Sequence, residues 1–578
     1  MIKKLIKSVR EYKRDSILAP TFVTLEVVME VIIPYLMAEL IDKGIDSGNM
    51  NFILKIGIAL VISCVVSLTF GALAGRFAAT ASAGFAKNLR KDMFYNVQKF
   101  SFSNIDKFST SSIVTRLTTD ITNVQNAYQM IIRIAVRAPL MLIFSLVMAF
   151  GINHRLSLIF LAAIPILGVG LYIIMSHAHP IFERVFKIYD KLNNVVQENL
   201  YGMRVVKSFV REDYEEKKFK KVSGDIYNDF VKAEKLLSFN APLMQFASYG
   251  CILLISWFGA RFIVSKTMTT GELTSLIAYA MQILMSLMML SMVFVMIIMA
   301  RASAERIAEI LCEESDLKNP ENPVTEIKNG DISFKNVNFG YSKKKKKMCL
   351  KNINFDIKSG ETIGIIGGTG SSKSSLVQLI PRLYDTISGE VLVGGRNVKE
   401  YDIESLRGEV AMVLQKNVLF SGTIKENLRW GDENASDEDI ERVCRLAQAD
   451  EFIQKFPEKY DTYIEQGGSN VSGGQKQRLC IARALLKKPK ILILDDSTSA
   501  VDTKTDASIR RAFREEIPNT TKIIIAQRIS SVEDADKIIV MENGEINGMG
   551  THEELLASNE IYKEVYNLQV KGGGSDEK

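Results

Sequence analysis

Residues 362–380 read TIGIIGGTGSSKSSLVQLI. The stretch begins with a short apolar run, passes through a loop of glycine and serine, and continues with the apolar spacing of a helix. A strand, a glycine-rich loop and a helix in this order form the context of a P-loop. Glycines let backbone N–H groups surround a phosphate, and the start of the helix adds the positive end of its dipole. The stretch therefore predicts a phosphate-binding α/β domain.

The chemistry of the loop points to a nucleotide with a metal ion. Lys373 is placed to reach the β- and γ-phosphates, and the hydroxyl of Ser374 is placed to bind Mg²⁺. Ser372 departs from the P-loop pattern, which has glycine directly before the lysine, and its Cβ is expected to crowd the phosphates or strain the turn. Taken alone, the motif could also be a chance loop of serine and glycine. The predicted ATP-binding residues of the loop are Gly367, Thr369, Gly370, Ser371, Ser372, Lys373, Ser374 and Ser375.

Strand-like and helical segments alternate around this loop, which is typical of an α/β domain with a largely parallel sheet. The segment ILILDD, residues 491–496, is an apolar strand that ends in carboxylates. Asp495 is placed at that end to hold Mg²⁺, directly or through water.

The first half of the chain is much more apolar than the second. Crossing a bilayer takes about 20 mostly apolar residues. Six such runs make buried helices of a soluble protein the weaker alternative, and they exclude a soluble P-loop kinase. We therefore predict a membrane all-α domain of six transmembrane helices joined to an α/β P-loop nucleotide-binding domain. The six runs are roughly 17–41, 53–77, 131–152, 156–176, 243–264 and 273–300.

Shifts of composition set the expected domain limits. The membrane domain is predicted over residues 1–310 and the nucleotide-binding domain over 329–567. Between them, residues 311–328 are polar, contain two prolines and indicate a linker. The polar, glycine-rich end, residues 568–578, is predicted to be disordered.

Positive charge indicates the orientation in the membrane. Lysine and arginine are concentrated in the N-terminal segment and in two long loops, residues 79–130 and 177–242, whereas the other connections are short and carry few. The positive-inside rule then places both termini and both long loops in the cytoplasm. We expect these loops to extend helices two to five, each pair being joined by a short crossing helix.

The N-terminal segment is basic and has one apolar face. Ile2, Leu5, Ile6, Val9 and Tyr12 make up this face. A basic helix with one apolar face suits the surface of a membrane, before the first span.

Two features of the predicted spans can each be interpreted in two ways. Arg133 and Arg137 lie in the third span, where a charge is a functional candidate, but both are close enough to the cytoplasmic side to snorkel. Methionines on one side of the sixth span suit an adaptable substrate cavity or ordinary packing, and we favour packing. These methionines are Met281, Met285, Met288, Met289, Met292, Met296 and Met299.

The overall composition excludes several other classes. A net charge of +6 is modest for 578 residues and gives no reason to expect nucleic acid as a partner. The 6 cysteines form no CxxC pair and read as free thiols of a reducing compartment. The run Lys343–Lys347 is interpreted as a solvated hairpin tip, with nucleic acid or lipid contact as the weaker alternative.

A second motif lies between the P-loop and Asp495. VSGGQ, residues 471–475, resembles the signature of the ATP-binding cassette (ABC) family, which no other P-loop class carries. By the same resemblance Tyr341 would stack on adenine, Gln415 would be the Q-loop glutamine that joins the metal site to the membrane domain, and Asp502 would belong to the D-loop.

The resemblance extends into the membrane half. FSFSNIDKFSTSSIVTRLTTD, residues 100–120, and YGMRVVKSFVRED, residues 201–213, look like the cytoplasmic loops of multidrug-type exporters. The resemblance implies a bacterial cytoplasmic membrane, ATP and Mg²⁺ as cofactors, and an amphipathic drug, peptide or lipid as substrate. It also implies a dimer that closes on ATP and reopens on hydrolysis, in which the signature acts on the partner's ATP. The signature residues concerned are Ser472, Gly473, Gly474 and Gln475.

Two more positions depart from the pattern of the family at the catalytic site. Asp496 stands where the family has glutamate, and its carboxylate is about 1.5 Å shorter in reach. Gln527 stands where the family has the switch histidine, and an amide carries no positive charge. Together with Ser372, these two departures belong to one nucleotide site, whereas the signature sequence has no departure from the family pattern.

We therefore expect one half of a heterodimeric exporter, whose own ATP site is degenerate and whose signature completes a competent site on a second ABC half-transporter. A self-sufficient homodimer remains the first alternative. An ATP-binding regulator without turnover is the second.

Overall fold

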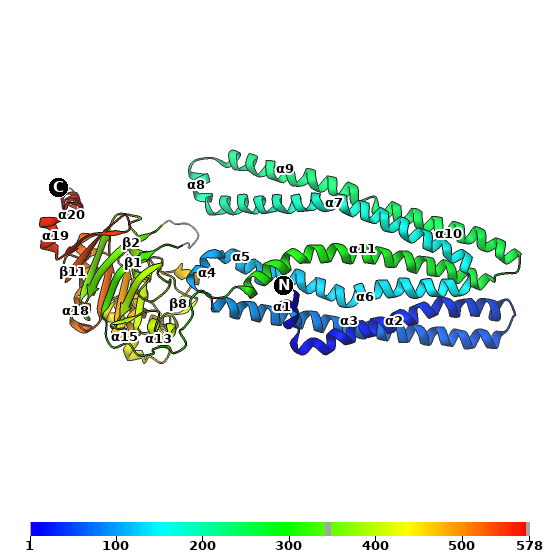
Figure 1. Cartoon of the computed structure of the whole chain (residues 1–578), viewed down its shortest axis with the longest axis horizontal. Helices are drawn as coiled ribbons and strands as arrows, with labels where there is room; N and C mark the ends of the chain where they lie inside the picture. The colour runs from blue at the N-terminus through cyan, green and yellow to red at the C-terminus, as the bar shows by residue number, and fades with distance from the viewer. Residues whose placement is uncertain (1, 342–347, 574–578) are drawn as a thin grey trace. The chain divides into compact units, whose positions relative to one another are not determined.

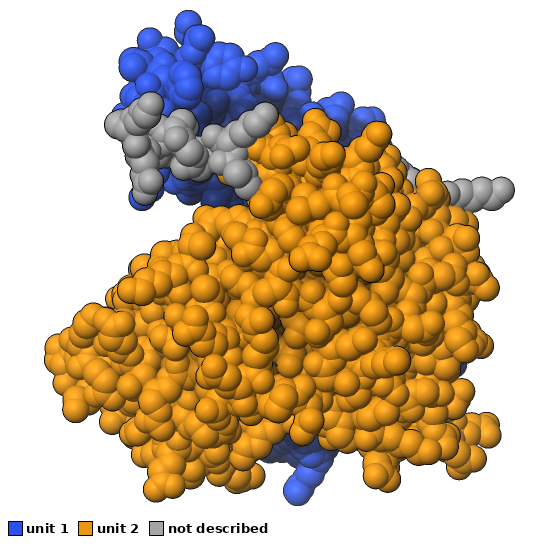
Figure 2. Space-filling model, turned by 90° about the vertical axis from the view of Figure 1, so that its left-hand side faces the viewer, with its two compact units in different colours: residues 1–98, 110–313 blue, residues 99–109, 314–578 orange. Residues whose placement is uncertain are grey.

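The computed structural model describes residues 2–341 and 348–573, which form two compact units. The first unit comprises residues 1–98 and 110–313, and the second comprises residues 99–109 and 314–578 (Figure 2). The lysine run 343–347 lies outside the described residues.

The first unit is entirely helical (Figure 1). Its described part contains 6 helical segments that are long and apolar enough to cross a membrane, and each of the predicted spans falls inside one of them. Its helices are α1 (Ile2–Lys7), α2 (Lys13–Leu40), α3 (Met50–Gln98), α5 (Thr110–Thr115), α6 (Ile121–Ile152), α7 (His154–Tyr201), α8 (Met203–Ser208), α9 (Glu212–Leu237), α10 (Asn240–Val264) and α11 (Thr270–Cys312), with the short η1 (Arg10–Tyr12), η2 (Ile41–Ile45) and η3 (Arg116–Asp120).

Several of these helices are much longer than a membrane is thick. α3 has 49 residues and α7 has 48, whereas crossing the hydrocarbon takes about 20. The helices therefore continue beyond the span, as predicted for the two long loops. α7 and α9 run side by side and are joined through α8, the short crossing helix of the second loop (Figure 1).

The N-terminal segment differs from the single surface helix that its apolar face predicts. The chain turns after α1, and Leu5 and Val9 are buried inside the unit. Ser8 explains the turn, because its hydroxyl donates to Asp92 Oδ2 at 2.7 Å and its carbonyl accepts from Asn88 Nδ2 at 3.0 Å. Contacts with α3 thus fix this segment.

The second unit contains two larger sheets where the sequence predicted one that is largely parallel. A 6-stranded sheet has the order β12-β11-β3-β10-β9-β6 and is parallel except at β11–β12. A 4-stranded antiparallel sheet has the order β2-β1-β4-β5, and β7 pairs with β8. The strands are β1 (Ile332–Phe339), β2 (Leu350–Ile357), β3 (Thr362–Gly367), β4 (Ser388–Val393), β5 (Arg396–Asn397), β6 (Val410–Val413), β7 (Gly422–Thr423), β8 (Tyr463–Ile464), β9 (Ile491–Asp495), β10 (Thr521–Ile525), β11 (Lys537–Glu542) and β12 (Glu545–Gly550).

The second unit has two apolar cores: one packs helices such as α15, α17 and α18 against the parallel sheet, and the other contains residues of both larger sheets. The unit also contains several helices. They are α4 (Phe102–Lys107), α12 (Lys373–Val377), α13 (Ile403–Glu409), α14 (Ile424–Leu428), α15 (Asp437–Leu446), α16 (Asp450–Ile453), α17 (Gly473–Leu486), α18 (Thr503–Glu516), α19 (His552–Ser558) and α20 (Glu560–Gly573).

The end of the chain also differs from expectation, because α20 continues into the segment predicted to be disordered from residue 568. The side chain of Gln569 holds the helix in place: its amide donates to the carbonyl of Gln527 at 2.8 Å and its oxygen accepts from the N–H of Ile529 at 2.9 Å.

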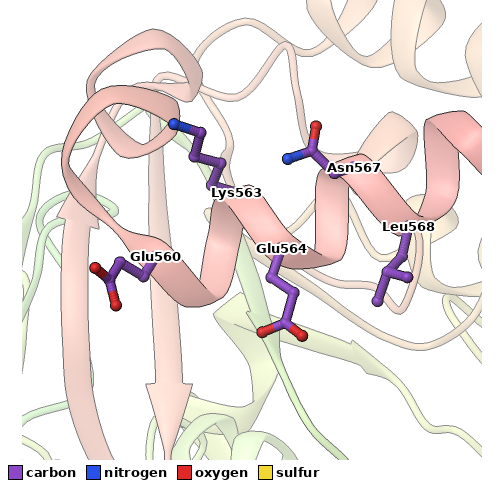
Figure 3. Close-up of a pocket in the computed structure, with 5 residues that line it drawn as sticks. All are labelled: Glu560, Lys563, Glu564, Asn567 and Leu568. Carbon is purple, nitrogen blue, oxygen red and sulfur yellow. The ribbon is translucent and has the colours of Figure 1, made fainter.

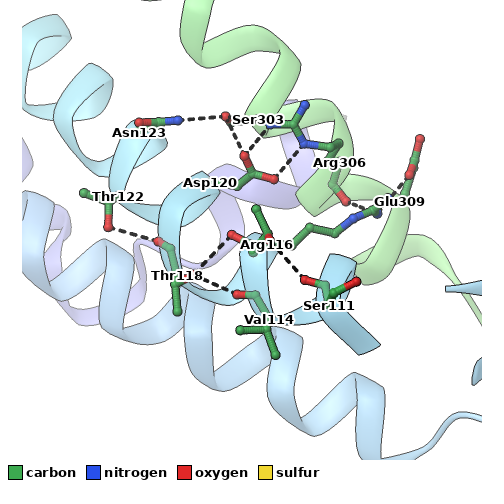
Figure 4. Close-up of polar contacts among 11 residues, drawn as sticks. Ser111, Val114, Arg116, Thr118, Asp120, Thr122, Asn123, Ser303, Arg306 and Glu309 are labelled. Atoms are coloured by element: carbon green, nitrogen blue, oxygen red, sulfur yellow. Dashed lines mark hydrogen bonds and ion pairs between the residues drawn. The ribbon is translucent and has the colours of Figure 1, made fainter. Parts of the chain in front are cut away.

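A polar cluster joins helix extensions beyond the predicted spans in the first unit (Figure 4). Asp120, which is 1% exposed, accepts hydrogen bonds from Ser303 Oγ at 2.9 Å and from Arg306 Nε at 2.7 Å. Arg116 donates to the carbonyl of Arg306 at 2.7 Å and contacts Glu309 at 2.9 Å. The cluster therefore ties η3 to the last turns of α11.

Asp120→Ala is expected to lower the melting temperature of the solubilised full-length protein. The variant leaves Ser303 and Arg306 without their acceptor, which costs about 1–3 kcal/mol of unfolding free energy. Glu305→Ala is the matched control, because Glu305 pairs with Arg301 on the exposed side of the same helix. Equal melting temperatures for the two variants would contradict this role of the cluster.

Candidate nucleotide site

The glycine-rich loop lies at the carboxyl end of β3, between two parallel neighbours, and leads into α12. An added side-chain carbon at Gly368 or at Gly370 would meet no atom within 4 Å, so the face of the loop is open. Backbone N–H groups at the start of a helix, beside open space, suit an anionic group. The loop therefore fits the phosphates that its sequence predicts.

Ser372 has φ +72°, in the left-handed region of the backbone. A residue with a Cβ pays roughly 1–2 kcal/mol there, whereas glycine does not. The departure from the P-loop pattern is thus a point of backbone strain, as the sequence suggested. It falls at the residue directly before Lys373, which is predicted to bind phosphate.

Lys373 folds back over its own loop. Its ammonium donates to the carbonyls of Gly367 at 2.7 Å and of Gly368 at 2.9 Å. Burial lowers the pKa of Lys373, and the charges of Asp495 and Asp496 oppose that shift. A phosphate on the open face would offer the same ammonium a stronger, charged acceptor.

The predicted metal ligands are partly brought together. Ser374 Oγ donates to Asp495 Oδ1 at 2.9 Å, at the end of the buried strand β9. Burial raises the pKa of Asp495, and the hydrogen bond from Ser374 opposes the shift. A hydroxyl beside a carboxylate is the oxygen donor set that Mg²⁺ prefers, so these two residues fit the ion. Gln415 is exposed and contacts the neighbouring Asp496 instead.

Asp496 is held by two amides. Gln527 Nε2 donates to Asp496 Oδ2 at 2.8 Å, and Gln415 Nε2 approaches the same oxygen at 3.4 Å. The structure therefore brings the two atypical residues of the catalytic pattern into direct contact. This contact joins the ends of β9 and β10, which are neighbours in the parallel sheet.

Tyr341 lies beside α12, where its hydroxyl is 2.8 Å from Ser375 Oγ. Its ring is half exposed and meets the ring of Tyr384 edge-on at 5.1 Å, which leaves a face for stacking. Tyr384 in turn donates to Asp106 Oδ2 at 2.6 Å, so it joins Tyr341 to α4, the crossing helix of the first loop. Sequence reasoning did not single out Tyr384.

The signature begins helix α17. Ser472 is the N-cap, and it exchanges hydrogen bonds with Gln475 in a capping box. A side-chain carbon on Gly474 would lie 2.8 Å from the carbonyl oxygen of Ala500, so only glycine fits this close approach.

Gln477 links the signature to the D-loop, and sequence reasoning missed it. It is buried, accepts from the N–H of Ala500 at 3.0 Å and donates to Ser499 Oγ at 3.3 Å. Its spacing two residues after Gln475 was the available signal. Asp502 caps α18 through the N–H of Thr505, and this hydrogen bond lowers the pKa of Asp502.

A surface hollow elsewhere in the second unit has no comparable chemistry. It runs along α20, and its labelled side chains come from that one helix and diverge around it (Figure 3). They are Glu560, Lys563, Glu564, Asn567 and Leu568.

Comparison with known proteins identifies the family to which this chain is similar. Residues 16–303 match the family model of the ABC transporter transmembrane region, and residues 350–499 match that of the ABC transporter. The ABC transporter ATP-binding protein YfiB of Bacillus subtilis is 38% identical over 575 residues, which are 100% of both chains. The chain belongs to the ABC transporter family.

Further similarities agree with this ABC transporter assignment. An ABC transporter ATP-binding protein of Mycobacterium tuberculosis is 34% identical over 571 residues, covering 98% of this chain and 97% of that one. The structure of a bacterial Atm1-family ABC exporter with ATP bound shares the fold, with a TM-score of 0.85, 24% identity and coverage of 96% and 99%. The chain is thus an ABC-type ATPase fused to a multi-pass membrane domain, and it couples ATP to transport.

Substitutions at Ser372 are expected to reveal the strain in the loop. Ser372→Val should lower the melting temperature, because a β-branched residue fits the left-handed region worst, whereas Ser372→Gly should equal or exceed the wild type. Thr369→Val in the same exposed loop, at a position without positive φ, is the matched control and should change little. Equal effects of both valine substitutions would show that Ser372 is unstrained.

Proposed function

We propose that the chain is one half of a heterodimeric ABC exporter for amphipathic substrates. Its own P-loop forms a weak, ATP-holding site. Its signature completes a competent site on the partner chain. The observation that carries the proposal is the contact between Asp496 and Gln527, at the two positions where the family has glutamate and histidine.

The proposed weakness of the site follows from its chemistry. A general base must reach the water that it polarises, and a displacement of about 1 Å can cost roughly 10²-fold in rate. The shorter Asp496 side chain is also drawn toward Gln527. Gln527 offers an amide N–H to a γ-phosphate but no positive charge. Binding then needs only the loop, Lys373 and Ser374 with Asp495, all of which fit ATP and Mg²⁺.

An intact signature argues for a partner that differs from this chain. Ser472 and Gln475 form a complete capping box, and Gly474 packs against the D-loop. A chain that had lost all nucleotide function would have no need of these contacts. In the proposed dimer they serve the ATP of the partner, which would carry the glutamate and the histidine.

Export from the cytoplasm is supported by the domain order and by likeness to an Atm1-family exporter. In the proposed orientation both termini and both long loops are cytoplasmic, in the membrane of a bacterium. α4, in the first of these loops, contacts Tyr384 through Asp106. Because Tyr384 also contacts Tyr341, the proposed adenine position and a crossing helix share one side chain.

The test is ATP hydrolysis by the chain purified alone in lipid nanodiscs, with ATP binding measured in the same sample. We expect binding with little turnover from the wild type. The double variant Asp496→Glu, Gln527→His should hydrolyse ATP at least about 10²-fold faster, because two such chains form two competent sites. Brisk turnover by the wild type would overturn the degenerate site and favour a homodimer.

Signature variants make the test specific. Ser472→Arg in the double-variant background should abolish the gained turnover while ATP binding remains, since the signature acts across the dimer. Lys373→Ala should abolish binding itself. Turnover that survives Ser472→Arg would show that the signature serves no partner.

A further inference from the structure

Two pairs of charged side chains lie in the spans that α2 and α6 contribute to the first unit. Glu26 and Glu30 are one turn apart on α2, and Arg133 and Arg137 are one turn apart on α6. Counted at 1.5 Å per residue from residue 17, where the first span is predicted to begin, Glu30 is about 20 Å along the helix, beyond the middle of a core of about 30 Å. Charges at this depth are costly, which makes the group a candidate for function.

Arg137 binds both glutamates. Its NH2 group donates to the two oxygens of Glu30 at 2.7 and 2.8 Å, and its NH1 group donates to Glu26 Oε1. Sequence reasoning left both a functional charge and snorkelling open for Arg137. Its ion pairs with α2 show instead that the side chain is held within the helix bundle.

One oxygen of Glu26 and the guanidinium of Arg133 remain without partners after these contacts. Glu26 is 7% exposed, and its second oxygen, Oε2, is buried without a hydrogen-bond partner. Arg133 is half-buried and makes no ion pair or hydrogen bond within residues 2–341 and 348–573. An unpaired buried carboxylate oxygen and an unpaired guanidinium are each expensive in a membrane.

Both unpartnered groups face the same helix. A side-chain carbon on Gly71 would lie 3.6 Å from the unpartnered Glu26 Oε2, and one on Gly75 would lie 3.8 Å from Arg133 NH1. Gly71 and Gly75 are one turn apart on α3, about 6 Å along the axis. The two opposite charges are thus set along α3 at roughly the spacing of one helical turn.

Aromatic rings adjoin the charges. Phe22 lies one turn before Glu26 on α2, and its ring is 6.0 Å from that of Phe70 and stacked at 5.5 Å on that of Phe77. Ring faces of this kind attract ammonium groups and also accept apolar chains.

We propose that Glu26 and Arg133, held by Arg137 and Glu30, form the head-group site for a zwitterionic amphiphile. Its ammonium binds at Glu26, its anionic group binds at Arg133, and its apolar tail lies along Phe22 and the neighbouring apolar helix faces. The inference names the substrate class of the proposed exporter and rests on that function.

Charge complementarity selects the zwitterion over simpler ligands. With two glutamates and two arginines, the group has no net charge, so a neutral ligand with both charges leaves it balanced. A purely cationic ligand would leave Arg133 unpaired, and an anionic one would leave Glu26 Oε2 unpaired. Glu30 and Arg137, whose side chains are 25% and 22% exposed, line the accessible side of the group.

Binding by the full-length chain in dodecyl maltoside, without nucleotide, tests this site. Three probes share a 12-carbon tail: lysophosphatidylethanolamine, dodecylamine and dodecyl phosphate. Calorimetric titration of the wild type should show the zwitterion binding about tenfold more tightly than either singly charged probe. Because nucleotide is absent, this result is independent of whether the ATP site is degenerate.

Two variants should weaken the binding of different singly charged probes. Glu26→Gln should weaken the binding of the zwitterion and of dodecylamine about tenfold and leave the binding of dodecyl phosphate unchanged. Arg133→Gln should weaken the binding of the zwitterion and of dodecyl phosphate and leave the binding of dodecylamine unchanged. Glu39→Gln, the same change near the outer end of α2, is the control. Equal weakening of all three probes, no change, or tighter binding of a singly charged probe than of the zwitterion would each overturn the proposal. If Glu26→Gln fails to fold, Arg133→Gln alone decides, because Arg133 makes no ion pair or hydrogen bond within residues 2–341 and 348–573 that the change would remove.

Discussion

A bilayer core holds no water that could hydrogen-bond a broken backbone, and this constraint shapes the first unit. A crossing must therefore satisfy its backbone groups within the protein, as a helix does, and α3, α7 and α11 are continuous over far more residues than one crossing needs. A long helix moves as a rigid body, so displacement at one end is passed to the other. The polar cluster of Asp120, Arg116 and Arg306 joins η3 to the last turns of α11, so these two segments are linked by hydrogen bonds.

The parallel sheet determines which residues meet at the nucleotide site. Because β3, β9 and β10 are neighbouring parallel strands, their carboxyl ends bring Lys373, Asp495 and Gln527 together from segments far apart in the chain. Each of these residues follows a buried apolar strand, so its position depends on the core.

Much of the fold and of the nucleotide site could be predicted from the sequence, because the spans are continuous apolar runs and the P-loop and signature are short motifs. The six spans and the strand–loop–helix order around Lys373 are such cases. Contacts between distant segments left no local pattern: Ser8 with Asp92, Gln569 with Ile529, and the second, antiparallel sheet. Arg137 was visible as a charge in a span, but its partners on α2 became apparent only when the helices were packed.

Hydrogen bonds connect the signature helix of this chain to its D-loop. This connection suggests a reason why a weak ATP site would be kept. Gln477 bonds to Ser499 and Ala500, and the hydroxyl of Ser499 donates to the carbonyl of Asp496 at 3.0 Å. A short path of hydrogen bonds thus runs from the signature helix α17 to Asp496. In the proposed heterodimer, ATP held without turnover would keep Asp496 in place, and through Ser499 and Gln477 it would steady the signature that the partner needs. A weak site would then serve as a fixed support for the competent one.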